Sequence, residues 1–131
     1  MTKICLEQNT NAWFEMEGGG QVHLQTVAID DFKNIRQQTV KKKVEFRRVD
    51  GKAERFEFDE INETLQNELF WDRIILEWKD LCDSNGNPIE CTKANKILLI
   101  TRSPKFVSFI TESLEKLKEM DTQRIEDTEK N

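Results

Sequence analysis

Apolar residues alternate with polar ones in the first part of the chain, which is the period of half-buried β-strands. Two short runs, KICLE and AWFEME, precede a glycine triplet, and QVHLQTV follows it with Val22 and Leu24 on one face. These runs predict a small antiparallel sheet. The next segment, AIDDFKNIRQQ, places Ile29, Phe32 and Ile35 three residues apart and carries two aspartates near its start, which predicts a short helix.

The segment VKKKVEFRRVDGKAERFEF predicts a β-hairpin over about residues 41–58, because two alternating runs flank an Asp-Gly pair. A two-residue loop would place Phe46 and Phe56 on opposite faces of the hairpin, and such a register cannot bury both side chains. We therefore expect a three-residue loop, VDG, that sets Val44 opposite Phe56 and gathers the apolar residues on one face.

A helical period follows the hairpin. DEINETLQNELFWDRIILEWKDLC carries apolar residues at spacings of three and four, which predicts one long helix with Trp71 and Trp78 on its buried face. Thr92 is expected to cap a second helix, and Ser103 before Pro104 predicts the start of a third that runs to about residue 120. The inward-facing residues of this last helix are expected to be Phe106, Phe109, Ile110, Leu114 and Leu117.

These elements predict an α+β fold, in which a small antiparallel N-terminal sheet with the hairpin packs on a C-terminal set of about three helices. We expect Trp71 and Trp78 to cover the hairpin as part of the core, rather than to form an exposed stacking platform. With 131 residues and 37% hydrophobic content, residues 1–120 fit a single domain. The polar residues 121–131 are expected to form a frayed tail.

Charge is distributed unevenly along the chain. The net charge is −3 over residues 1–35, +4 over residues 36–58 and −6 over residues 59–131. A basic middle segment between acidic ones is typical of a nucleic-acid footprint or of an internally neutralised protein, and the acidic total favours the second interpretation.

The predicted hairpin contains the basic residues that a nucleic-acid-binding β-ribbon would use. Its aromatic residues are expected to face inward, and three glutamates lie among the bases, so a solvated strand face is favoured. The candidate phosphate-contacting residues are Lys41, Lys42, Lys43, Arg47, Arg48, Lys52 and Arg55.

The stretch DSNGNPIECT resembles a calcium-binding loop, because Asp83, Asn85 and Asn87 alternate along it. The loop of an EF-hand requires Gly at its sixth position and Glu at its twelfth, and those positions hold Pro88 and Ala94 here. We interpret the stretch as a turn between two helices. No metal site, cofactor site or catalytic set is predicted.

Few other residues suggest chemistry. Cys5, Cys82 and Cys91 form no CxxC pair, which predicts free thiols, and the lone His23 is expected to be a partly exposed strand residue. The triplet Gly18–Gly20 is expected to be a hairpin turn rather than a phosphate cradle, since no Lys-Ser/Thr pair follows it. The chain has no apolar run of about 18 residues and no signal-peptide pattern, so we expect a cytoplasmic protein.

Residues 69–110 resemble a pattern in small phage tail proteins, particularly tail assembly chaperones of long-tailed phages and their prophage relatives. The pattern comprises a Trp-containing segment at Trp78, a D-x-x-G-x-P turn from Asp83, a T-x-x-N-K helix start at Thr92, and a Phe, here Phe106, before the apolar stripe of a terminal helix. The strand-rich first half departs from this pattern, because such chaperones are largely helical.

The resemblance implies a non-enzymatic protein-binding protein that acts in tail assembly in the host cytoplasm. Its partners would be tape-measure or tail-tube proteins, with self-association as an open alternative. Partner contacts are placed provisionally on Leu114, Leu117 and Ile125. The alternative function is a small nucleic-acid-binding or regulatory module that uses the basic hairpin.

Calcium is expected to leave the fold unaffected, because the loop at Asp83 lacks both geometric requirements of an EF-hand. Titration calorimetry should show no micromolar calcium binding. Binding that Asp83→Ala abolishes would contradict the interpretation of this loop as a turn.

Overall fold

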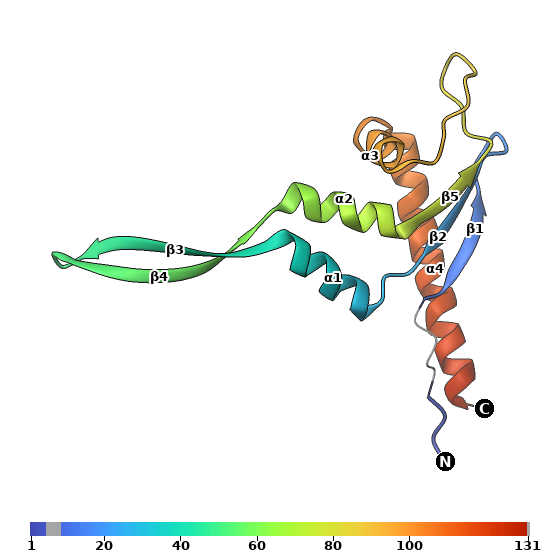
Figure 1. Ribbon diagram of the computed structural model, residues 1–131. Helices are drawn as coiled ribbons and strands as arrows, with labels where there is room; N and C mark the ends of the chain where they lie inside the picture. Colours follow the sequence, from blue (N-terminus) through green and yellow to red (C-terminus); the bar gives the residue numbers. More distant parts are fainter. Residues whose placement is uncertain (5–8, 131) are drawn as a thin grey trace.

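The structure is a computed structural model that describes residues 1–4 and 9–130. It confirms the α+β class and the small antiparallel N-terminal sheet (Figure 1). The strand expected at KICLE falls mainly on residues 5–8 and lies outside the described residues. The elements, in chain order, are β1 (Asn11–Glu15), β2 (Gln21–Gln25), α1 (Ile29–Thr39), β3 (Val40–Val49), β4 (Lys52–Ile61), α2 (Glu63–Ile74), β5 (Ile75–Lys79), α3 (Lys93–Arg102) and α4 (Pro104–Lys130).

The strands form two separate antiparallel sheets. One sheet has the order β1-β2-β5, and the other consists of β3 and β4 alone. Figure 1 shows the β3–β4 ribbon extending away from the rest of the molecule, with α1 and α2 side by side at its base. The three-stranded sheet, α3 and α4 form the body from which the ribbon projects.

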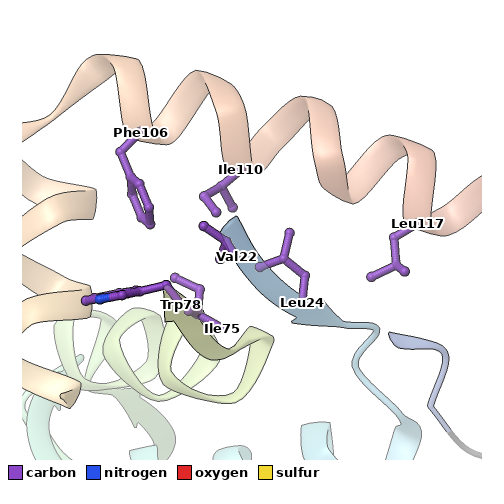
Figure 2. Close-up of a cluster of buried hydrophobic side chains, with 7 residues drawn as sticks. All are labelled: Val22, Leu24, Ile75, Trp78, Phe106, Ile110 and Leu117. Atoms are coloured by element: carbon purple, nitrogen blue, oxygen red, sulfur yellow. The ribbon is translucent and has the colours of Figure 1, made fainter. Parts of the chain in front are cut away.

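The core lies between one face of the three-stranded sheet and α4 (Figure 2). Trp78 and Phe106 meet edge to face, with ring centroids 6.1 Å apart and an angle of 82° between the ring planes. The indole N–H of Trp78 donates to the carbonyl oxygen of Ile89 at 2.7 Å, so the buried polar group has a partner. The buried apolar side chains of the cluster are Val22, Leu24, Ile75, Trp78, Phe106, Ile110 and Leu117.

The glycine triplet forms the β1–β2 turn, as predicted. Gly18 and Gly19 have φ values of 99° and 100°, which side chains with a Cβ rarely adopt. The N–H of Met16 donates to the carbonyl oxygen of Gly20 at 2.6 Å and closes the turn. A Cβ at Gly20 would lie 2.6 Å from Cδ2 of Leu81, so this glycine also allows the turn to approach the segment after β5.

The single long helix expected over residues 61–82 is wrong in its second half. Helix α2 ends at Ile74, and residues 75–79 form strand β5, which pairs with β2. The register shifts between His23 and Leu24, so that Ile75 and Trp78 are both buried although they lie three residues apart. A bulge therefore produces a three-residue spacing of buried side chains that is indistinguishable from a helical one in the sequence.

The expected loop of the β3–β4 hairpin is also wrong. Val49 pairs with Lys52, so the loop has two residues, and Asp50 and Gly51 have φ values of 52° and 80°. Positive φ at both central residues is the requirement of a type I′ turn, and Asp-Gly is a preferred pair for it. The three-residue loop was inferred from the need to bury one face, and that need does not exist because the hairpin is not packed on the body.

The expected cover of the hairpin by the tryptophans is wrong for the same reason. Trp78 packs against Phe106 in the core, and Trp71 is half-buried against that core. The apolar residues Val44, Phe46 and Phe58 of the hairpin are exposed.

The caps expected in the second half are confirmed, and so is the turn at Asp83, although it connects strand β5 to α3 and not two helices. Oγ1 of Thr92 accepts the N–H of Asn95 at 3.2 Å at the start of α3, and Oγ of Ser103 accepts the N–H of Phe106 at 3.2 Å in the first turn of α4. Oδ1 of Asp83 accepts two backbone N–H groups, from Asn85 at 2.9 Å and from Asn87 at 3.0 Å. The N–H of Asn87 is the main reason that the pKa of Asp83 lies below its usual range.

Helix α3 is attached to α2 through a buried lysine. Nζ of Lys96, whose residue is 7% exposed, lies 3.1 Å from Oδ1 of Asp72 and 3.2 Å from its carbonyl oxygen. The T-x-x-N-K pattern thus supplies a cap, through Thr92, and an ion pair, through the buried Lys96. Both are structural roles.

Helix α4 continues about ten residues beyond its expected end, to Lys130. Asp121 lies on this extension, where its carboxylate accepts the hydroxyl of Thr10 and forms an ion pair of 3.1 Å with Arg124. The hydrogen bond from Thr10 is the main cause of a lowered pKa of Asp121. The extension is therefore tied to the segment before β1. Among the described cysteines, Cys82 and Cys91 are free thiols, as predicted.

Replacing Trp78 with Ala should lower the free energy of unfolding by about 3–5 kcal/mol, the usual cost of truncating a buried aromatic residue. The melting temperature should fall by roughly 10 °C or more. Trp13 offers a matched control, because it stacks on His23 with centroids 4.8 Å apart and is 38% exposed. Thermal melts in which Trp13→Ala and Trp78→Ala were equally mild would contradict the core position of Trp78.

A projecting hairpin arm as the candidate functional site

The β3–β4 hairpin, residues 40–61, is the most exposed element of the described chain and is called the arm below. Every residue from 41 to 61 is exposed, and Val40 alone is half-buried. Phe46 is 69% exposed, Val44 46% and Phe58 44%. Exposed aromatic and aliphatic residues gathered on one element usually mark an interaction surface.

The base of the arm is held by a small polar cluster. Thr39 is 2% exposed; its hydroxyl donates to the carbonyl oxygen of Ile35 at 2.8 Å, and its carbonyl oxygen accepts the N–H of Asn62 at 2.8 Å. Asn62 also caps α2, because its side-chain oxygen accepts the N–H of Leu65 at 3.1 Å. The strand ends are therefore fixed to α1 and α2, and the distal part of the arm has no such support.

The register divides the arm into two faces, because residues directly opposite in an antiparallel pair point to the same side. The Phe46 face carries Val40, Lys42, Val44, Phe46, Arg48, Ala53, Arg55, Glu57, Asp59 and Ile61. The Phe56 face carries Lys41, Lys43, Glu45, Arg47, Val49, Lys52, Glu54, Phe56, Phe58 and Glu60.

The Phe56 face is partly covered by its own long polar side chains. The guanidinium of Arg47 lies over the ring of Phe56, 5.5 Å from its centroid, and forms an ion pair of 2.9 Å with Glu45. The hydrogen bond to Glu45 raises the pKa of Arg47. Lys43 and Glu60 form a further ion pair of 3.3 Å on this face.

The Phe46 face has less cover. Arg55 and Glu57 are joined by an ion pair of 3.0 Å, and Asp59 lies 3.8 Å from Arg36 of α1. Phe46 itself is more exposed than Phe56, which is 37% exposed. Phe46 is therefore the most exposed aromatic residue of the arm.

The seven basic residues predicted as candidate phosphate contacts all lie on the arm and are exposed. Three of them, Lys43, Arg47 and Arg55, form ion pairs with glutamates of the arm. The other four have no ion pair with a described residue, and they are Lys41, Lys42, Arg48 and Lys52. The structure brings the seven together on one element and neutralises part of their charge.

The three residues placed provisionally at a partner contact lie on α4, away from the arm (Figure 1). Leu117 is fully buried in the core, and Leu114 packs against the same cluster. Ile125 is half-buried. The exposed apolar residues of the arm were assigned to the core in the sequence. On both strands, charged residues stand next to these apolar residues in the sequence, and this pattern could have indicated that they are exposed.

Other kinds of site find little support in the described part of the chain. No group of three or more His, Cys, Asp or Glu residues there lies close enough together to hold a metal ion. No described helix combines the length and the apolar character needed to cross a membrane.

One comparison with known proteins gives a match. The model of a family described as YdaY prophage protein matches residues 26–131, a range that includes the whole arm. Neither a curated protein nor a solved structure matches the chain.

Proposed function

Because the chain belongs to the YdaY prophage protein family, we propose that it is a non-enzymatic protein-binding protein of a prophage and that the arm is its docking element. The observation that supports this proposal is the exposure of Phe46, Phe56 and Phe58 on an element that the described part of the chain leaves uncovered. The family match supports the prophage setting, and the exposure of the arm supports protein binding.

A two-stranded ribbon of this kind gains from a partner in two ways. An isolated hairpin is only marginally stable in water, so a protein that covers one of its faces would stabilise it. Both β3 and β4 are edge strands, with unpaired backbone groups that can add to the sheet of another protein. Folding and docking of the arm are coupled in this proposal.

A role in tail assembly is the specific form that we propose for this binding. It is supported by the resemblance of residues 69–110 to tail assembly chaperones. In this role the arm would hold a tape-measure or tail-tube protein through its exposed aromatic residues until the tail is built. The arm would replace the contacts on α4 considered in the sequence, because Leu117 has no exposed surface.

Nucleic-acid binding is the second candidate function, and the shape of the arm favours it. A two-stranded β-ribbon fits the major groove of DNA, and four basic residues of the arm have no described ion-pair partner. Six acidic residues lie among the seven basic ones of the arm, however, so its net charge is only +1. Phosphate binding depends on several uncompensated positive charges, and protein binding is therefore the better proposal.

Co-expression with the tail-tube and tape-measure proteins of the same prophage should give a complex that purifies together. The double variant Phe56→Asp/Phe58→Asp should weaken this complex by about ten-fold or more, because two charges would replace the apolar contact surface. Ile29→Asp is the matched control, since Ile29 is apolar, 74% exposed and outside the arm. A folded protein that binds neither tail protein would contradict the role in tail assembly.

Duplex DNA should bind no more tightly than the roughly 10⁻⁴–10⁻⁶ M typical of non-specific contacts near physiological salt. Fluorescence anisotropy at two salt concentrations measures this affinity and its salt dependence. Salt-sensitive nanomolar binding that is lost when Lys41, Lys42 and Lys43 are replaced by Glu would favour the nucleic-acid function instead.

A further inference from the structure

We infer that the Phe46 face of the arm docks against the Phe46 face of a second copy of the chain, with the two arms antiparallel. This inference rests on the proposed function, because it takes the arm as the docking element. It assigns one face of the arm to self-association and leaves the Phe56 face to the prophage partner.

The apolar part of the Phe46 face is the part of the arm with the least cover. Phe46 is 69% exposed and Val44, two residues before it, is 46% exposed. On the opposite face, Arg47 lies over Phe56 and partly shields it. Phe46 is therefore the single side chain of the arm whose burial would remove the most aromatic surface from water.

The order of side chains on the Phe46 face makes it complementary to itself when one copy is turned end to end. Two antiparallel arms that pack face to face are related by a two-fold axis, with β3 over β3 and β4 over β4. We place the axis between the pair Val44–Glu57 and the pair Phe46–Arg55, which are neighbouring levels of the ribbon.

At the two levels beside the axis, this placement matches unlike charges and apolar side chains. Phe46 then meets Val44 of the second copy on β3, and Arg55 meets Glu57 of the second copy on β4. The symmetry produces each contact twice. Arg55 and Glu57 are already paired at 3.0 Å within the chain, so the two copies together would form a cluster of four alternating charges.

The outer levels of the face match less well than the two central ones. Arg48 comes near Lys42 of the second copy, which would be unfavourable alone. Asp59, directly opposite Lys42 across the ribbon, supplies the compensating negative charge. Ala53 lies opposite Arg48 and leaves space at this level.

Edge-to-edge pairing of two arms is less favourable. Strand β3 carries five basic residues and one acidic residue, so pairing β3 with β3 would place like charges side by side. Pairing β3 with β4 of an arm pointing the same way would bring the two bodies together, because neighbouring strands lie only about 4.8 Å apart. Antiparallel face-to-face packing places the bodies at opposite ends of the ribbons, which project clear of them (Figure 1).

The size of the face sets the expected strength. Ten strand residues span about 33 Å, and two strands are about 10 Å wide. Such a face is smaller than the roughly 800 Å² that each partner buries in a stable complex of standard size. The dimer should therefore be concentration-dependent and micromolar rather than nanomolar.

Sedimentation equilibrium of the full chain over a series of concentrations tests this inference. We expect a monomer–dimer equilibrium that Phe46→Asp abolishes and that Phe56→Asp, on the opposite face, leaves unchanged. Arg55→Glu and Glu57→Arg should each weaken the dimer by about ten-fold or more. The double variant Arg55→Glu/Glu57→Arg should restore it, because the reversed charges again meet their opposites across the two-fold axis.

Several outcomes would overturn the inference. A monomer at every concentration, or a dimer that Phe46→Asp leaves intact, would each do so. A double variant that fails to restore association, while its circular dichroism matches the wild type, would also contradict the inference. Species larger than a dimer would indicate edge-to-edge pairing instead. A monomer that still binds a tail protein would end this inference and leave the proposed function in place. A dimer that binds no tail protein would contradict the proposed role in tail assembly and leave the self-association of the arm in place.

Discussion

The packing of α4 on the three-stranded sheet is the contact on which the other features depend. Phe106 of α4 holds Trp78 of β5 edge to face, and Val22 of β2 lies in the same cluster. Strand β2 leads into α1, and α2 leads into β5. The segment from α1 to α2, which includes the arm, therefore starts and ends on neighbouring strands of the sheet. That constraint places α1 beside α2, where the ring centroids of Phe32 and Phe70 are 5.2 Å apart, and the arm projects outward from these two helices.

The structure of the arm depends on local interactions and not on packing against the body. Its register is set by the Asp-Gly turn and by opposite charges across the strands, such as Lys42 opposite Asp59 and Arg47 opposite Glu54. Neither face has to be buried within the chain, so each face can keep aromatic residues among charges. An element built in this way keeps its aromatic side chains exposed along both faces of the ribbon.

Much of the fold could be predicted because its signals are local. The caps at Thr92 and Ser103 and the turn at Asp83 each involve residues within four positions of one another, and all three were identified correctly. The arm was located, and so were its seven basic residues. Its exposure was missed, because alternation of apolar and polar residues shows that a strand has two faces and does not show what covers them.

The sequence by itself determined the α+β class, the order of most elements, the ends of α3 and the start of α4, since these follow from short-range hydrogen bonds and periodicity. Only the tertiary structure decided that residues 75–79 form a strand and that the arm stands free. Strand β5 exists because β2, about fifty residues earlier, pairs with it, and an extra residue in β5 shifts the register so that Ile75 and Trp78 both enter the core. The arm is exposed because α4, and not the arm, covers the apolar face of that sheet.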